Sequence, residues 1–298
     1  MIKALYAMFE SNFTYGDLKL GRGNFNLPPI LIGTIFYQGE TIVDSDHTDI
    51  FNERKAKKRI ENHKKLALQY KLPEMIEISA VDPKSMKKYL EFYLNNYNSP
   101  FILGGTLDAR IAGIEYLNEN GIKPTEYVYN SISSLGNKKE LEVIKRNRIQ
   151  SVVILILGSE DMTSTQRYNY LIKKKTSNSV NLIDGIKDLG VERIWIDGGV
   201  INLESLASIL ENQQLVSKSL NLPVGTAPNL FLFRYSSPRL NKKYHTRYRR
   251  ASIMFIATWF SNFIFYGPIE DAIESFVSAY QAFEFKKVVK NKNIKLMD

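Results

Sequence analysis

Short apolar runs alternate with longer segments of helical spacing from about residue 30 onward. In several of these runs apolar residues follow one another directly, as in Ser151–Leu157, instead of alternating with polar ones. Strands that are buried on both faces have this pattern, because neither face needs polar side chains. The predicted strands are Ile30–Phe36, Met75–Ser79, Phe101–Leu103, Tyr127–Asn130, Ser151–Leu157, Arg193–Asp197, Leu222–Gly225 and Phe263–Tyr266.

A segment with helical spacing follows each predicted strand, as Leu90 and Leu94 illustrate within Pro83–Tyr97. The predicted helices are Glu53–Tyr70, Pro83–Tyr97, Leu107–Asn120, Lys138–Arg148, Gln166–Leu189, Asn202–Leu220, Arg247–Phe260 and Ile269–Val289. Eight strands that each precede a helix favour an α/β fold, a (β/α)8 TIM barrel. An open doubly wound sheet is the alternative.

The first 29 residues stand outside this repeat. Two apolar segments, Lys3–Phe13 and Leu18–Leu20, flank Tyr15-Gly16-Asp17, which predicts a β-hairpin that closes the bottom of the barrel. We therefore divide the chain into an N-terminal hairpin extension (1–29), the barrel (30–290) and a basic tail (291–298).

Composition excludes several classes of protein. The chain has 298 residues, of which 44% are hydrophobic, so it is not disordered. It contains no cysteine, which excludes disulfides, thiolate nucleophiles and Cys-ligated metals. No apolar run reaches the length of a membrane span, and no signal peptide is evident, so we expect a cytoplasmic protein without a transmembrane segment. The scattered histidines His47, His63 and His245 are expected on the surface, and no metal site is predicted.

The net charge of +9 is concentrated in one stretch. Residues 229–268 contain no Asp or Glu, and their seven basic residues are Arg234, Arg239, Lys242, Lys243, Arg247, Arg249 and Arg250. Tyrosines interleave with these side chains, a mixture that suits nucleic acid, another anionic ligand or an acidic partner.

Polar residues gather where the predicted strands end, which is where barrels carry their chemistry. They include Glu77, Ser79, Thr106, Asn130, Asp197 and Asn229. Carboxylates, amides and hydroxyls without an evident nucleophile suit a planar heterocycle with amide-like edges. Asp108 and Asp161 are instead expected at helix N-termini.

Six stretches, in the same order along the chain, resemble one known family. They are LPPILIGTIFYQGETIVDSDHTDIFNERKA (27–56), MIEISAVDPKSM (75–86), PFILGGTLDARIAGIEYL (100–117), YVYNSIS (127–133), LPVGTAPN (222–229) and FYGPIEDA (265–272). The chain is similar to the H subunit of tetrahydromethanopterin S-methyltransferase, within the wider group of pterin-binding methyltransferase barrels.

The resemblance implies a methyltransferase that moves the N5-methyl of a methyl-tetrahydropterin, tetrahydromethanopterin-like or tetrahydrofolate, to or from Co(I) of a corrinoid on a partner protein. By the same resemblance Glu77 and Asp197 bind the aminopyrimidine edge, and Asn130 lies beside N5 as the catalytic residue. Contacts from Ser79, Thr106 and Asn229 complete the expected substrate site. The resemblance also implies a possible homodimer.

The basic stretch gains a role from the same resemblance. We expect Arg234, Arg239 or Lys243 to meet the acidic tail of the pterin or an acidic corrinoid partner.

Two departures from the family pattern leave alternatives open. Gly104-Gly105-Thr106 stands where an Asp-Ser-Thr-like strand end is expected, and Gly158 stands where an Asn is expected. Losing a buried acceptor costs about 1–3 kcal/mol of binding, or roughly 5–150-fold in affinity. The first alternative is therefore a barrel of this superfamily with an altered pterin or other anionic ligand and different or lost activity. A basic nucleic-acid-binding protein is the further alternative, disfavoured because the strand-end carboxylates would go unused.

Overall fold

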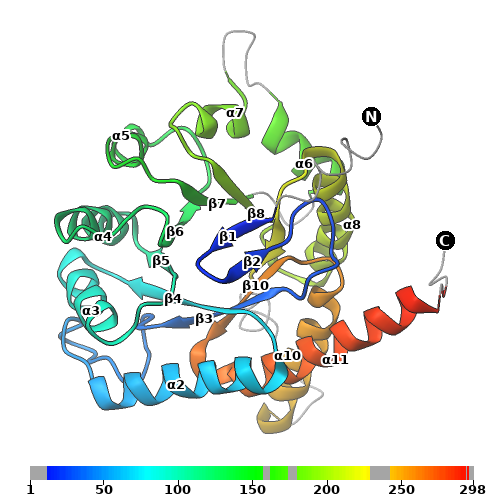
Figure 1. The fold of residues 1–298 in the computed structure, drawn as a ribbon, viewed down its shortest axis with the longest axis horizontal. Coiled ribbons are helices and arrows are strands. Elements are labelled where there is room, and N and C mark those ends of the chain that lie inside the picture. The colour runs from blue at the N-terminus through cyan, green and yellow to red at the C-terminus, as the bar shows by residue number, and fades with distance from the viewer. Residues whose placement is uncertain (1–11, 157–161, 174–179, 229–241, 293, 295–298) are drawn as a thin grey trace.

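The chain folds into a closed barrel of eight parallel strands in the order β10-β3-β4-β5-β6-β7-β8-β9 (Figure 1). The structure, a computed structural model, describes residues 12–156, 162–173, 180–228, 242–292 and 294. The barrel strands are β3 (Ile30–Ile35), β4 (Glu74–Ala80), β5 (Phe101–Gly105), β6 (Tyr127–Ile132), β7 (Ser151–Leu155), β8 (Arg193–Asp197), β9 (Val224–Thr226) and β10 (Phe263–Pro268). The predicted (β/α)8 barrel is confirmed, and the alternative of an open doubly wound sheet is wrong.

Helices surround the barrel (Figure 1). They are α2 (Glu53–Tyr70), α3 (Pro83–Asn96), α4 (Leu107–Glu119), α5 (Lys138–Arg146), α6 (Ser164–Ile172), α7 (Leu182–Lys187), α8 (Leu203–Leu220), α10 (Lys242–Thr258), the 3-10 turn η1 (Ile269–Asp271) and α11 (Ala272–Asn291). One prediction is wrong, because Gln166–Leu189 is not a single helix. A capping box between Thr163 and Gln166 begins α6, and the Asn181 side chain caps the separate α7.

A hairpin of β1 (Phe13–Tyr15) and β2 (Leu18–Leu20) closes the N-terminal end of the barrel, as predicted, although Tyr15 belongs to β1 and not to the turn. Most of the predicted first arm, Lys3–Phe13, lies outside the described residues. The Tyr15 hydroxyl donates to Ser151 Oγ (3.0 Å) and accepts from Trp195 Nε1 (2.9 Å). The hairpin and the barrel interior share one apolar core, whose members are Phe13, Tyr15, Leu20, Ile30, Ile32, Met75, Ile102, Val128, Val153, Trp195, Phe263 and Phe265. This end of the barrel is therefore filled and serves stability.

The side chains that point into the barrel change from apolar to polar toward the C-terminal ends of the strands. Side chains two residues apart on a strand face the same side. Glu77 follows two residues after the core residue Met75, and Asp197 follows two residues after Trp195. Asn130 stands in the same relation to the core residue Val128 on β6. The strands themselves therefore aim these polar groups into the barrel just above its core.

The prediction that His63 lies on the surface is wrong. Its side chain is fully buried between α2 and the outer face of the barrel. Its Nδ1 lies 2.6 Å from the Tyr266 hydroxyl and its Nε2 lies 3.0 Å from Glu74 Oε2. Gly33 makes room for this contact, since a Cβ there would lie 2.2 Å from the Tyr266 oxygen. His47 is exposed, as predicted, and the side chain of His245 lies outside the described residues.

Within the described ranges, no helix is both long and apolar enough to cross a membrane. The same residues contain no group of three or more His, Asp or Glu side chains placed to hold a metal ion.

Candidate functional site at the barrel mouth

Glu77 is the centre of a preorganised cluster at the C-terminal end of the barrel. Its Oε2 accepts from Thr34 Oγ1 and its Oε1 accepts from Asn130 Nδ2, both at 2.6 Å. Burial raises the pKa of the Glu77 carboxyl, while the two hydrogen bonds lower it. The two neighbours hold the carboxylate in place and leave each oxygen able to accept another hydrogen bond.

Gly104 on the adjacent strand makes the space that the Glu77 carboxylate occupies. A Cβ at position 104 would lie 2.4 Å from Glu77 Oε1 and 2.9 Å from its Cδ. The carboxylate therefore leans from β4 over the end of β5. The glycine that departs from the family pattern is the residue that allows this, and sequence reasoning treated it only as a lost acceptor.

Asp197 supplies the second buried carboxylate, from β8. Its Oδ1 accepts from the Gly199 N–H at 2.9 Å. The Asp197 pKa is raised to about 7, mainly by burial and also by the nearby Glu77 charge, which together outweigh the lowering effect of the Gly199 and Ala227 N–H groups. In the closed order of strands β4 and β8 are four positions apart, so Glu77 and Asp197 face each other from opposite walls.

Arg167 of α6 lies behind Asp197, and sequence reasoning missed it. Its side chain is buried, its Nη1 donates to the Gly198 carbonyl (2.6 Å), and its Nε donates to Ser208 Oγ (3.3 Å). Burial lowers the Arg167 pKa, and its charge in turn lowers the pKa of Asp197. The guanidinium thus secures the backbone next to Asp197 and favours its ionised form.

Asn130 lies on β6, midway between the two carboxylate-bearing strands. Because its Nδ2 donates to Glu77, its Oδ1 is left to accept a hydrogen bond. The structure thus brings together Glu77, Asn130 and Asp197, the residues on which the sequence argument depended most.

The other predicted site residues are placed differently. Ser79 is half-buried on β4, two residues beyond Glu77. Thr106 is exposed and caps α4, accepting from the Ala109 N–H and donating to the Val81 carbonyl, while Asp108 lies in the first turn of that helix, as expected. The described residues do not include Asn229, Arg234, Arg239, Gly158, Asp161 or the side chain of Lys243.

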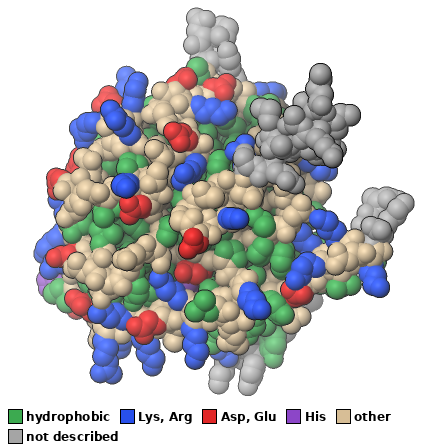
Figure 2. All heavy atoms as spheres, viewed as in Figure 1, with side chains coloured by type: hydrophobic (Ala, Val, Ile, Leu, Met, Phe, Trp, Pro, Cys, Tyr) green, Lys and Arg blue, Asp and Glu red, His purple; other side chains and the backbone are tan. Residues whose placement is uncertain are grey.

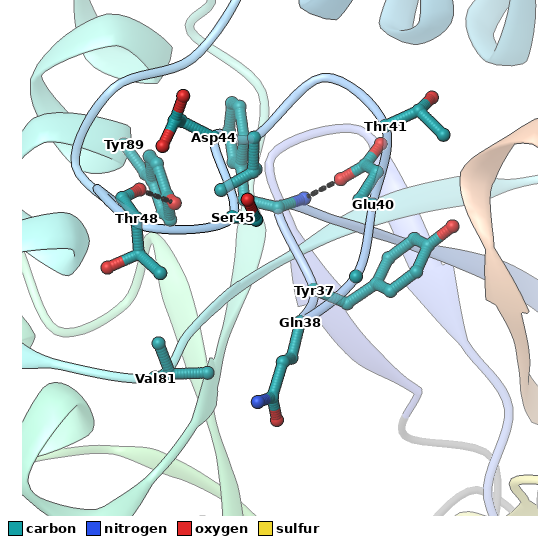
Figure 3. Close-up of a pocket in the computed structure, with 12 residues that line it drawn as sticks. Tyr37, Gln38, Glu40, Thr41, Asp44, Ser45, Thr48, Val81 and Tyr89 are labelled. Atoms are coloured by element: carbon teal, nitrogen blue, oxygen red, sulfur yellow. Dashed lines mark hydrogen bonds between the residues drawn. The ribbon is translucent and has the colours of Figure 1, made fainter.

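A pocket of about 450 Å³ adjoins the mouth beside the ends of β3 and β4. Figure 3 shows its labelled lining residues Tyr37, Gln38, Glu40, Thr41, Asp44, Ser45, Thr48, Val81 and Tyr89. Its buried Glu40 accepts from the Phe36 N–H and pairs with Arg59, and burial raises the Glu40 pKa to about 7. The Tyr37 hydroxyl donates to Glu270 Oε1 (2.5 Å), which ties the loop after β3 to η1. This acidic rim suits hydroxyl donors better than anions.

Comparison with known proteins identifies related sequences. The family model described as "Tetrahydromethanopterin S-methyltransferase MtrH subunit" matches residues 12–295. The H subunit of tetrahydromethanopterin S-methyltransferase from Methanothermobacter marburgensis is 26% identical over 270 residues, covering 89% of this chain and 87% of the relative. The protein of the same name from Methanopyrus kandleri is 28% identical over 215 residues, which cover 71% of this chain and 66% of the relative.

Solved structures share the fold at low identity. A Yersinia pestis dihydropteroate synthase with a pterine-sulfa conjugate superposes with a TM-score of 0.62 at 12% identity, covering 93% of this chain and all of that one. A Xanthomonas albilineans dihydropteroate synthase gives a TM-score of 0.60 at 13% identity, and the superposition covers 92% of this chain and 95% of the synthase. At this identity the likeness shows the barrel architecture alone.

Proposed function

Because this chain belongs to the family of tetrahydromethanopterin S-methyltransferase MtrH subunits, we propose that it transfers the N5-methyl group of a methyl-tetrahydropterin to, or from, Co(I) of a corrinoid on a partner protein. The observation that carries the proposal is the convergence of two buried carboxylates and one carboxamide on the barrel mouth. The relatives are named as subunits, which supports a partner protein for this chain too. We place the reaction in the cytoplasm.

The aminopyrimidine edge of the pterin binds between Glu77 and Asp197. Its N–H groups are donors, and both carboxylates are acceptors when ionised. Since these side chains lie on opposite walls, a flat ring can bridge them across the mouth. Thr34 and Asn130 hold Glu77 in position before the ligand arrives, so little further ordering is needed on binding.

Asn130 assists departure of the methyl group. When the N5–CH3 bond breaks, its electron pair stays on N5, so a proton on N5 makes the amine a better leaving group. The Asn130 Oδ1 is left to accept from that N5–H, because its Nδ2 already donates to Glu77. The corrinoid supplies the nucleophile when bound, and the chain's own groups need only hold the ring, protect the proton and expose the methyl.

The basic stretch after β9 supports recognition of an anion. In our proposal Arg234, Arg239 or Lys243 meets the acidic tail of the pterin or an acidic corrinoid partner. Charge reversal at all three positions is then expected to weaken the affinity for pterin, for partner, or for both, and unchanged affinities would remove this role. Ser79, Thr106 and Asn229 remain proposed substrate contacts, and a homodimer remains a prediction.

Methyl transfer to cob(I)alamin tests the function directly. Purified protein is mixed with methyl-tetrahydromethanopterin or methyl-tetrahydrofolate, and the absorption of Co(I) is followed as methyl-Co(III) forms. We expect transfer by the wild type, a loss of at least about 100-fold in Glu77→Gln and Asp197→Asn, and no change in the exposed control Glu119→Gln. No transfer and no binding with any methyl-tetrahydropterin would contradict the proposal.

A further inference from the structure

An apolar groove of about 690 Å³ lies at the opposite end of the barrel from the proposed active site. It is lined by Phe25, Trp259, Phe260, Lys286, Val289, Lys290 and Ile294. Phe25 precedes β3 and Phe260 precedes β10, so both lie at the N-terminal ends of the barrel strands. The groove is therefore separated from Glu77 and Asp197 by the packed core of the barrel.

Aromatic rings build one wall of this groove. Phe25 meets Phe260 edge to face at 5.7 Å between ring centroids, and Trp259 meets Phe285 of α11 in the same way at 5.7 Å. Edge-to-face contacts of this kind fix ring orientation. The groove is therefore a preformed surface between the end of α10 and the C-terminal half of α11.

A lysine amine lies in this apolar setting, and none of the described residues places an anion beside it. Lys286 Nζ is inaccessible to solvent and makes no hydrogen bond or ion pair with the described residues, and it lies 5.4 Å from the centroid of the Phe25 ring. The neighbouring Lys290 Nζ donates to Asn26 Oδ1 (2.8 Å). A desolvated ammonium is costly unless an anion compensates it, and a second ammonium nearby makes it more so.

The same two helices carry further exposed apolar side chains. Ile256 of α10 and Phe285 and Val288 of α11 are 37%, 48% and 52% exposed. Figure 2 shows apolar side chains beside lysine and arginine side chains over this part of the molecule. The surface therefore combines apolar area with positive charge.

We propose that this groove binds a small apolar acid, a molecule with an aromatic or medium-chain aliphatic body and one carboxylate or sulfonate, and that the Lys286 amine turns from the Phe25 ring into the groove to pair with that anion. The aromatic wall takes the body, and the anion replaces the hydration that the ammonium has lost. A volume of about 690 Å³ is that of a small-molecule site. A neutral or cationic apolar molecule leaves the amine uncompensated and binds more weakly.

Binding of decanoate and of 8-anilinonaphthalene-1-sulfonate to the full chain tests this site. The chain has two tryptophans, and Trp259 lines the groove while Trp195 is buried in the barrel, so quenching of Trp259 reports on the groove. We expect the sulfonate to quench Trp259, decanoate to displace it, and decyltrimethylammonium to fail to do so. Because burial and Lys290 lower the Lys286 pKa to about 8, we expect decanoate affinity to fall above about pH 8.

Variants separate the ammonium from the apolar wall. We expect Lys286→Met to weaken decanoate binding at least about 10-fold and Lys286→Arg to retain it. Lys287→Met is the matched control, since Lys287 is exposed and pairs with Glu284, and it is expected to bind like the wild type. Removing an uncompensated charge is also expected to raise the melting temperature of Lys286→Met, which shows separately that this variant folds.

Equal affinity in Lys286→Met and wild type would overturn the proposal, as would an equal loss in Lys287→Met. Analytical ultracentrifugation with and without decanoate then distinguishes a small-molecule site from a contact between two copies of the chain. If the chain dimerises and decanoate dissociates the dimer, the groove is a contact between copies and not a small-molecule site.

Discussion

Asp197 combines a functional role with a cost to stability. Burial raises its pKa from an ordinary value of 3.8 to about 7, so the folded protein holds the Asp197 proton more tightly than the unfolded chain does. The stabilising effect of that proton is fully present below about pH 4 and is lost as the pH rises through about 7. At neutral pH and above, the folded state therefore bears the cost of a buried carboxylate that ligand binding requires.

Replacing Asp197 with Asn is expected to stabilise the protein and to abolish pterin binding. The gain in the free energy of unfolding is expected to be about 2 kcal/mol larger at about pH 8 than at about pH 5.5, because only at the higher pH is the full cost of ionisation present. Urea denaturation at the two pH values measures this difference. A pH-independent gain would contradict the raised pKa, and Glu119→Gln is the control.

Gly104 and Glu77 are expected to be energetically coupled. In Gly104→Ala the new Cβ displaces the Glu77 carboxylate, so pterin affinity is expected to fall at least about 10-fold. In a Glu77→Asp background the shorter side chain leaves the space above position 104, and the same substitution is expected to cost little. A double-mutant cycle is expected to give a coupling of about 1–3 kcal/mol.

Gly105 provides the contrast for this cycle. Its φ is +97° and its Cβ would lie 2.1 Å from the Ala80 carbonyl oxygen, so Gly105→Ala strains the backbone whatever residue occupies position 77. Equal penalties for Gly104→Ala in both backgrounds would remove the assigned role of Gly104.

At the scale of elements, the strands were predictable because the barrel buries both of their faces and leaves a direct apolar signature. The break between α6 and α7 was missed although the sequence carries a signal for it, because Thr176-Ser177-Asn178-Ser179 disfavour a helix interior and Asn181 can cap a new helix. Glu77 and Asp197 could be singled out because a carboxylate within or directly after an apolar run is exceptional.

The remaining site residues depend on contacts between strands that one sequence does not encode locally. Thr34 lies 43 positions from the Glu77 carboxylate that it supports, and Arg167 lies 31 positions from the Gly198 carbonyl that it contacts. His63 looks like a surface residue on a Lys-rich helix until Tyr266 and Glu74 are seen beside it. From the sequence alone, Gly104 could be interpreted only as the loss of a hydrogen-bond acceptor. Its role in making space for the Glu77 carboxylate becomes evident only when β4 lies beside β5.

The hairpin β1–β2 is expected to affect stability without affecting binding. In Tyr15→Phe the Trp195 Nε1–H and Ser151 Oγ lose their buried partner, which is expected to cost about 1–3 kcal/mol of unfolding free energy. Chemical denaturation measures the loss, and pterin titration of the same variant is expected to match the wild type. A weaker pterin affinity would mean that the filled end of the barrel influences the mouth.

At the scale of the whole molecule, the charge and the chemistry occupy different places. The chain carries +9 overall, yet the residues that converge at the mouth are two acids and an amide. Positive charge instead accumulates in the stretch after β9 and along the C-terminal half of α11. The ring of strand ends therefore selects hydrogen-bond donors.

The two ends of the barrel are expected to act independently. A rigid apolar core of tightly packed side chains separates the Lys286 groove from Glu77, and sites that share no contacts usually contribute additively within about 0.5 kcal/mol. Saturating decanoate is therefore expected to leave the pterin Kd unchanged, and Glu77→Gln is expected to leave the decanoate Kd unchanged. Isothermal titration of each ligand with and without the other measures this. A reciprocal shift in both constants would instead mean that α11 transmits movement through η1, whose Glu270 contacts Tyr37 at the mouth.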